Sequence, residues 1–156
     1  MPGITRCWFR IICVALGVAA ATAARAGSVI DDSGTLPYNA ALAMHWQQLT
    51  PRGSDATRMV GTLQLRVHLN VAPWLRRRGH IYLVLPAQQP GDIRAAWTTQ
   101  GRLLPGQLRA GNRVLVYAGA ITAPFIEDVM QLTVSVEGRR MLASYPVNFH
   151  FEMDGS

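Results

Sequence analysis

The chain has 156 residues, with 15 basic and nine acidic residues and a formal net charge of +6. Apart from the four histidines, every basic residue is an arginine. Chemistry that requires lysine, such as Schiff-base catalysis or a lysine-containing phosphate loop, is therefore excluded.

The first 26 residues have the three-part pattern of a bacterial secretory signal peptide. Met1 to Arg10 is a basic head, Ile11 to Ala24 is an uncharged run of apolar and small residues, and Ala24-Arg25-Ala26 has the form of a cleavage site. The continuous apolar run of about 14 residues is shorter than the ~20 that a membrane-spanning helix needs, which favours cleavage over a retained anchor. We therefore predict a signal peptide over residues 1–26, cleaved near Ala26 after Sec-type export, and a soluble periplasmic or secreted mature protein.

Cleavage would change the composition of the working protein. Both cysteines, Cys7 and Cys13, would leave with the leader, so disulfides, thiolate nucleophiles and cysteine metal sites are not expected in the mature chain. Removal of Arg6, Arg10 and Arg25 would leave 12 arginines against nine acidic residues, a formal excess of +3. This excess is too small to predict nucleic acid as a partner.

Residues 27–40 have the composition of a flexible mature N-terminus. Residues 41–154 are expected to form one domain, because no repeat, low-complexity tract or linker follows residue 40. The clearest element is Met59 to Val71, in which apolar residues alternate with polar ones such as Gln64 and Arg66. Alternation with a period of two predicts a long strand with one face in the core and one face in water.

Further strands are expected over Leu42 to Leu49, His80 to Leu85, Ile93 to Thr99, Arg113 to Ala118, Met130 to Glu137 and Tyr145 to Phe151. Ile81 to Leu85 is continuously apolar, which suggests a strand covered on both faces. Trp46 and Trp97 are expected in the core rather than on a carbohydrate-binding platform. Residues 122–130 leave room for a helical turn. About seven strands separated by frequent turns predict an all-β antiparallel β-sandwich, immunoglobulin-like in the broad sense.

The last two strands are predicted to form a hairpin. Met130 to Glu137 would pair with Arg140 to Met153 through a turn at Gly138-Arg139, because glycine at the first central position suits a type II′ turn. In this register Val134 lies opposite Ala143, and the apolar residues of both strands share one face.

The sequence contains no Gly-x-Ser-x-Gly elbow, no His-Glu-x-x-His motif and no phosphate-binding glycine loop. His45, His68, His80 and His150 are not spaced as local metal ligands, so a three-histidine zinc site would need distant strands to converge. Glu127-Asp128 offers an acid/base pair, but adjacent carboxylates in a loop usually point apart. We therefore predict a non-enzymatic protein with no catalytic residue, no cofactor and no metal site.

One connection is singled out as a binding surface, because Trp74, Arg76, Arg77 and Arg78 cluster in it. Guanidinium groups can fork onto phosphates or carboxylates while the indole stacks on a sugar or an apolar edge. The alternative is a solvated loop with Trp74 packed into the edge of the sandwich.

Two classes of function are compatible with these observations. The first is an exported, non-enzymatic cell-envelope protein that binds another envelope protein or an anionic envelope component, for example as an accessory to secretion, pilus or surface-structure assembly. The second is a periplasmic ligand-binding protein or small hydrolase that uses a His-bearing sheet face. The sandwich does not separate the two classes, because that architecture carries many unrelated functions.

Overall fold

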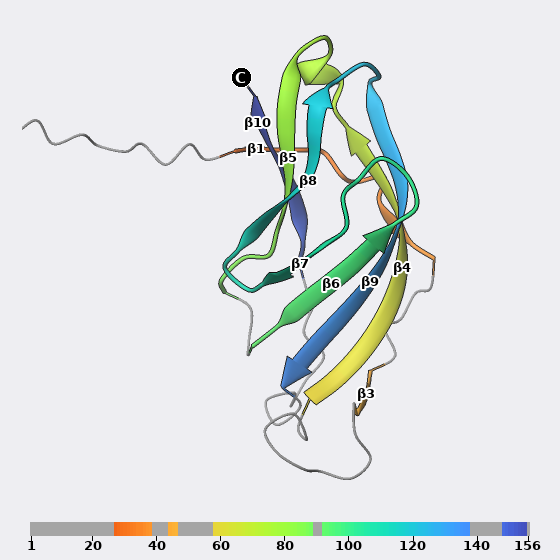
Figure 1. Ribbon diagram of the computed structural model, residues 1–156, viewed down its shortest axis with the longest axis vertical. Coiled ribbons are helices and arrows are strands. Elements are labelled where there is room, and N and C mark those ends of the chain that lie inside the picture. Colours follow the sequence, from red (N-terminus) through yellow and green to blue (C-terminus); the bar gives the residue numbers. More distant parts are fainter. Residues whose placement is uncertain (1–26, 39–43, 47–57, 89–91, 138–147, 156) are drawn as a thin grey trace, which may run out of the picture.

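The computed structural model describes residues 27–38, 44–46, 58–88, 92–137 and 148–155, and within these ranges the protein is all-β. Two antiparallel sheets pack in a sandwich-like arrangement (Figure 1). This confirms the all-β antiparallel class predicted from the sequence. In the described part of the chain no helix has the length and hydropathy to cross a membrane. The predicted signal peptide lies outside the described residues.

The first sheet has the strand order β1-β10-β5-β8. Its strands are β1 (Ser28–Val29), β10 (His150–Gly155), β5 (Arg78–Val84) and β8 (Arg113–Ala120). β5 is an inner strand, because it pairs with β10 along one edge and with β8 along the other. The register with β8 shifts between Ile81 and Tyr82, as a β-bulge would produce.

The second sheet has the order β2-β4-β9-β6-β7, and β3 also pairs with β4. Its strands are β2 (Leu36–Pro37), β3 (His45–Trp46), β4 (Arg58–Asn70), β6 (Arg94–Thr99), β7 (Gly106–Arg109) and β9 (Phe125–Glu137). β4 and β9 pair along their whole length and form the long curved pair of strands in Figure 1. β6 lies along the other edge of β9.

The described residues form ten strands, whereas about seven were predicted. The three additional strands are β1, β2 and β7. β1 and β2 are two residues long and lie at sheet edges, and β3, also two residues long, falls within the strand predicted over Leu42 to Leu49. Such short strands carry too few residues to show a period of two. β7 contains Gly106, which was interpreted from the sequence as part of a turn.

The N-terminal segment differs from the flexible terminus that its composition suggested. β1 pairs with β10, and β2 pairs with β4, so residues 28–37 contact both sheets. Ile30 between them is 1% exposed, and its backbone N–H donates to the carbonyl of Phe151 at 2.8 Å. A single buried isoleucine in a polar stretch has no periodicity, and this is why the sequence did not reveal it.

The alternation predicted for β4 is confirmed. Val67, Leu69 and, just after the strand, Val71 are buried, while Gln64 and Arg66 are exposed. These side chains join a single core between the sheets, to which β5, β6, β8, β9 and β10 also contribute. Each fully buried aliphatic side chain of this kind contributes about 1.5–3 kcal/mol relative to exposure.

β5 is covered on one face, not on both as its apolar run suggested. Ile81 and Leu83 are buried, whereas Tyr82 and Val84 on the opposite face are partly exposed. The Arg113 guanidinium lies over the Tyr82 ring, 4.4 Å from its centroid. The Arg113 side chain on β8 therefore covers part of the outer face of β5, and its charged end remains in contact with water.

The predicted hairpin of Met130–Glu137 with Arg140–Met153 is wrong. Val134 has ladder partners on both β4 and β6, so neither edge of β9 is available to β10. β10 pairs with β1 and β5 in the other sheet. The predicted turn and Ala143 lie outside the described residues. Alternation fixes which face a residue takes but not which strand lies beside it.

Candidate functional site

The connection between β4 and β5 is an ordered turn. Residues Ala72–Trp74 form the 3-10 turn η2, and the Asn70 Oδ1 atom accepts the Ala72 N–H at 3.2 Å. The Trp74 side chain is partly buried and packs against the core. Trp74 therefore anchors the connection, in agreement with the alternative in which its ring is packed into the edge of the sandwich.

The tip of this connection is tied to the connection between β8 and β9 by two backbone hydrogen bonds. Arg76 N–H donates to the Ile121 carbonyl at 2.9 Å, and Ile121 N–H donates to the Arg77 carbonyl at 2.8 Å. Ile121 is itself buried in the core. Arg76 has a φ of 63°, the only positive φ at a non-glycine residue in the described part of the chain.

The side chains at the tip point to solvent. Arg76, Arg77 and Arg78 are all exposed. Within the described residues, the Arg76 and Arg77 side chains make no hydrogen bond, ion pair or ring contact. Two adjacent arginines with no described side-chain partner therefore extend from a backbone that is held in place by hydrogen bonds. We call Trp74 to Arg77 the tip loop.

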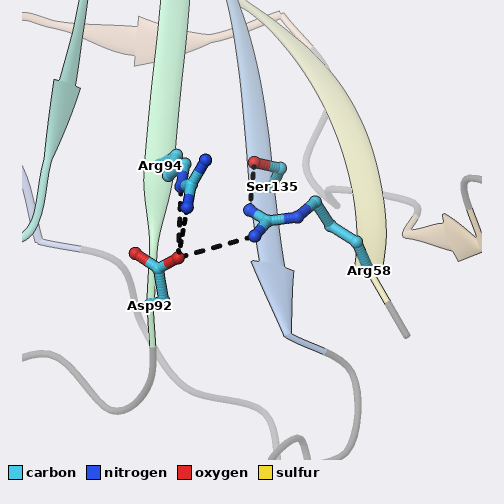
Figure 2. Close-up of polar contacts among 4 residues, drawn as sticks. All are labelled: Arg58, Asp92, Arg94 and Ser135. Atoms are coloured by element: carbon cyan, nitrogen blue, oxygen red, sulfur yellow. Dashed lines mark hydrogen bonds and ion pairs between the residues drawn. The ribbon is translucent and has the colours of Figure 1, made fainter. Parts of the chain in front are cut away.

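A second arginine cluster, which the sequence gave no reason to expect, lies at one end of the second sheet (Figure 2). Arg94 donates to Asp92 Oδ2 through Nε at 3.1 Å and Nη2 at 2.9 Å. Arg58 Nη2 lies 3.5 Å from the same oxygen, and Arg58 Nη1 donates to Ser135 Oγ at 3.4 Å. Residues of β4, β6 and β9 are joined in this way, although they are far apart in sequence.

The two arginine groups differ in whether a carboxylate of the described chain pairs with them. The hydrogen bonds and charge of Arg94, with a smaller contribution from Arg58, hold the pKa of the Asp92 carboxyl below its ordinary value. Arg58 and Arg94 are therefore occupied by an internal carboxylate, and we interpret their cluster as a tie across the sheet. Arg76 and Arg77 have no such carboxylate among the described residues, so they are better suited to bind an external anion.

The described histidines do not come together. His68 on β4 lies 3.0 Å from Glu127 through Nδ1 and packs against the ring of Phe125, with 4.7 Å between centroids. His150 on β10 lies 3.2 Å from Glu152, in the other sheet. Within the described residues, no three His, Cys, Asp or Glu side chains form a group that could hold a metal ion.

Glu127 and Asp128 lie on strand β9, not in a loop, and point to opposite faces of the sheet. Asp128 is 6% exposed and accepts backbone N–H groups of Gln100 at 3.2 Å and Leu103 at 2.8 Å. A Cβ at Gly101 would lie 2.9 Å from the Asp128 carboxyl carbon, so glycine permits the close approach. Asp128 organises the connection after β6, and Glu127 is exposed on the outer face.

The two tryptophans predicted for the core behave differently. Trp97 is 3% exposed and its Nε1–H donates to the Leu104 carbonyl at 2.9 Å, so it is a core residue as predicted. Trp46 is 49% exposed, because β3 pairs only at the edge of β4. The core interpretation of Trp46 is therefore wrong.

Comparison with known proteins found no matching protein-family model, no matching curated protein and no matching solved structure.

Proposed function

We propose that this is an exported, non-enzymatic cell-envelope protein that binds another envelope component through its tip loop. In this proposal residues 1–26 are a cleaved signal peptide, and the mature domain is a β-sandwich that is immunoglobulin-like in the broad sense. The leader pattern supports export, and the exposed Arg76 and Arg77 support an anionic group on the partner. Trp74 anchors the loop, because its side chain packs against the core.

The observation that carries the proposal is the backbone of Arg76. A left-handed conformation costs a residue with a Cβ roughly 1–2 kcal/mol, and glycine is the usual residue at such positions. Arg76 occupies this conformation at the exposed tip of the loop, where its side chain makes no hydrogen bond, ion pair or ring contact with a described residue. Backbone strain of this kind is concentrated at functional sites, where the contribution of the side chain to function offsets the loss of stability.

The chemistry of the partner follows from the guanidinium group. Arginine presents a planar fork of donors that matches phosphate and carboxylate oxygens in pairs. Envelope groups of this kind include lipopolysaccharide phosphates, anionic lipid headgroups, peptidoglycan carboxylates and acidic patches of proteins. The fixed backbone of the loop loses little further freedom on binding, so the ordering cost is confined to the arginine side chains, at about 0.5–1.5 kcal/mol each.

The test compares two double variants with the same loss of charge. The tip variant carries Arg76→Ser and Arg77→Ser, and the control variant carries Arg102→Ser and Arg109→Ser, two exposed arginines outside the loop. The exported protein is used to capture partners from envelope extract. We expect the control variant to retain the partner that the wild-type protein captures, and the tip variant to lose it. Equal capture by both variants would contradict the proposal.

A third variant separates function from stability. Arg76→Gly removes the guanidinium group but relieves the left-handed strain, so the free energy of unfolding should be unchanged or raised by up to about 1 kcal/mol. Capture should still fall. If Arg76→Gly instead lowers the free energy of unfolding by more than about 1 kcal/mol, the arginine is structural. Export is tested by the N-terminal sequence of the periplasmic protein, which should start near Gly27.

The alternative function, a ligand-binding protein or small hydrolase on a His-bearing face, has less support. His68 and His150 each contact one glutamate and belong to different sheets. Metal content separates the two classes: a stoichiometric metal in the purified mature protein would favour the alternative.

A further inference from the structure

A cavity of about 400 Å³ lies between the two sheets, away from the tip loop. Its volume falls within the ~300–1,000 Å³ of small-molecule sites, which are typically apolar with a few polar groups. The walls come from β4, β5, β9 and the start of β10, and two polar residues lie at the edge. The lining residues are Asp32, Thr35, Leu63, Leu65, Leu83, Met130, Leu132, Val134, Phe149 and Phe151.

The cavity arises because the second sheet is longer than the first. Figure 1 shows β4 and β9 continuing beyond the ends of β5 and β10. Leu63 and Leu65 belong to the same core stripe of β4 as the buried Val67, yet both are partly exposed. Gly61, the next residue of the stripe, has no side chain to fill the space. The described residues of the first sheet therefore leave this apolar part of the inner face only partly covered.

The polar edge of the cavity contains the carboxylate of Asp32, which pairs with no other residue in the described part of the chain. The hydroxyl group of Thr35 already has a hydrogen-bond partner, because its Oγ1 accepts the backbone N–H of His68 at 3.1 Å. Asp32 is different: among the described residues, no other residue donates a hydrogen bond to its carboxylate or forms an ion pair with it. Burial raises the pKa of Asp32 above its ordinary value, against smaller opposing effects of a hydrogen bond from its own backbone N–H and of the positive charge of His150.

We propose that this cavity binds a small amphipathic molecule, an apolar chain with a cationic amine head, whose ammonium group pairs with Asp32. The apolar walls take the chain, and removal of their surface from water drives binding. An ammonium supplies the hydrogen-bond donors that no other described residue offers to this carboxylate. A chain with a carboxylate head would instead bring a second negative charge to Asp32. The site is separate from the tip loop and does not depend on the proposed function.

The experiment compares decylamine and decanoate, which differ in the head group, as ligands of the mature protein at pH 7. Both are titrated calorimetrically below their micelle concentrations. We expect decylamine to bind at least about tenfold more tightly than decanoate, the ratio that one charge-assisted hydrogen bond supplies. Equal affinities, or no saturable binding of either probe, would overturn the proposal.

Three variants test the two parts of the site. Asp32→Asn should abolish the preference for the amine, whereas Asp31→Asn, at an adjacent exposed carboxylate, should retain it. Leu63→Phe adds volume inside the cavity. It should weaken the binding of both probes without lowering the melting temperature. If Leu63→Phe lowers the melting temperature, another segment of the chain fills the space and the proposal fails. Persistence of the amine preference in Asp32→Asn would also overturn it.

Discussion

Strand β4 passes through two different environments, although its sequence keeps one pattern throughout. In its closed segment, which runs from Val67 to the end of the strand, and at Val71 just after it, the inward side chains are at most 1% exposed, with Leu69 at 0%. In its open segment, Leu63 and Leu65 point to the same side but border the cavity and stay partly exposed. Alternation thus sets the direction of a side chain, while the length of the opposing sheet decides whether it is buried.

Deletion of one leucine side chain in each segment gives the largest contrast. Leu69→Ala should lower the free energy of unfolding by about 2–5 kcal/mol, because it removes buried apolar surface and leaves a cavity in a packed core. Leu63→Ala should cost only about 1 kcal/mol, since its side chain is already partly hydrated. Denaturant-induced unfolding measures both values. Equal losses would mean that the open segment is packed as tightly as the closed one.

A second contrast lies on β9, where adjacent carboxylates occupy the core face and the solvent face. Asp128→Ala should lower the free energy of unfolding by about 2 kcal/mol, because the buried N–H of Leu103 loses its acceptor. Glu127→Ala, the matched control, should change it by at most about 0.5 kcal/mol, as exposed substitutions usually do. A loss for Glu127→Ala as large as that for Asp128→Ala would show that its contact with His68 is not a surface pair.

These contrasts show where sequence reasoning succeeds. The strand over Met59 to Val71 was predictable because a 13-residue strand repeats its alternation many times. Asp128 was placed in a loop, and its buried position was not predicted, because one carboxylate on an apolar stripe looks like the end of the strand. Its partners, the amides of Gln100 and Leu103, come from a distant connection that no local pattern indicates.

The candidate site was predictable only in part. The clustering of arginines beside Trp74 marked the tip loop in the sequence. The left-handed backbone of Arg76 and its tie to Ile121 depend on the packing of two connections, so they appear only in the structure. The cavity was not foreseeable, because Leu63 and Leu65 have the pattern of ordinary core residues. Its polar edge comes from Asp32, in a segment whose composition suggested a flexible terminus.

The smallest expected effect compares the adjacent carboxylates Asp31 and Asp32. Burial raises the folded-state pKa of Asp32 above 3.8, whereas hydrogen bonds from Ser33 lower that of Asp31. Asp32 therefore destabilises the fold when it is ionised: the penalty is fully present above its raised pKa and disappears as the pH falls below about 3.8. The ionised carboxylate of Asp31 instead stabilises the fold. Its contribution to the free energy of unfolding is present above pH 3.8 and is lost as the pH falls through its lowered pKa.

Melting temperatures measured from pH 3 to pH 7 test this difference in sign. At pH 7, Asp32→Asn should melt slightly above the wild-type protein and Asp31→Asn slightly below it, since each substitution removes one ionised carboxylate. Both differences should shrink as the pH falls, the Asp32 difference first, because its pKa is the higher of the two. The wild-type protein is measured without an added amine, because an ammonium ligand would pair with Asp32 and reverse the sign of its effect. An Asp32→Asn variant that melts below wild type at pH 7 would show that a partner already stabilises this carboxylate in the free protein, and the edge of the cavity would then resemble the paired cluster of Asp92 and Arg94.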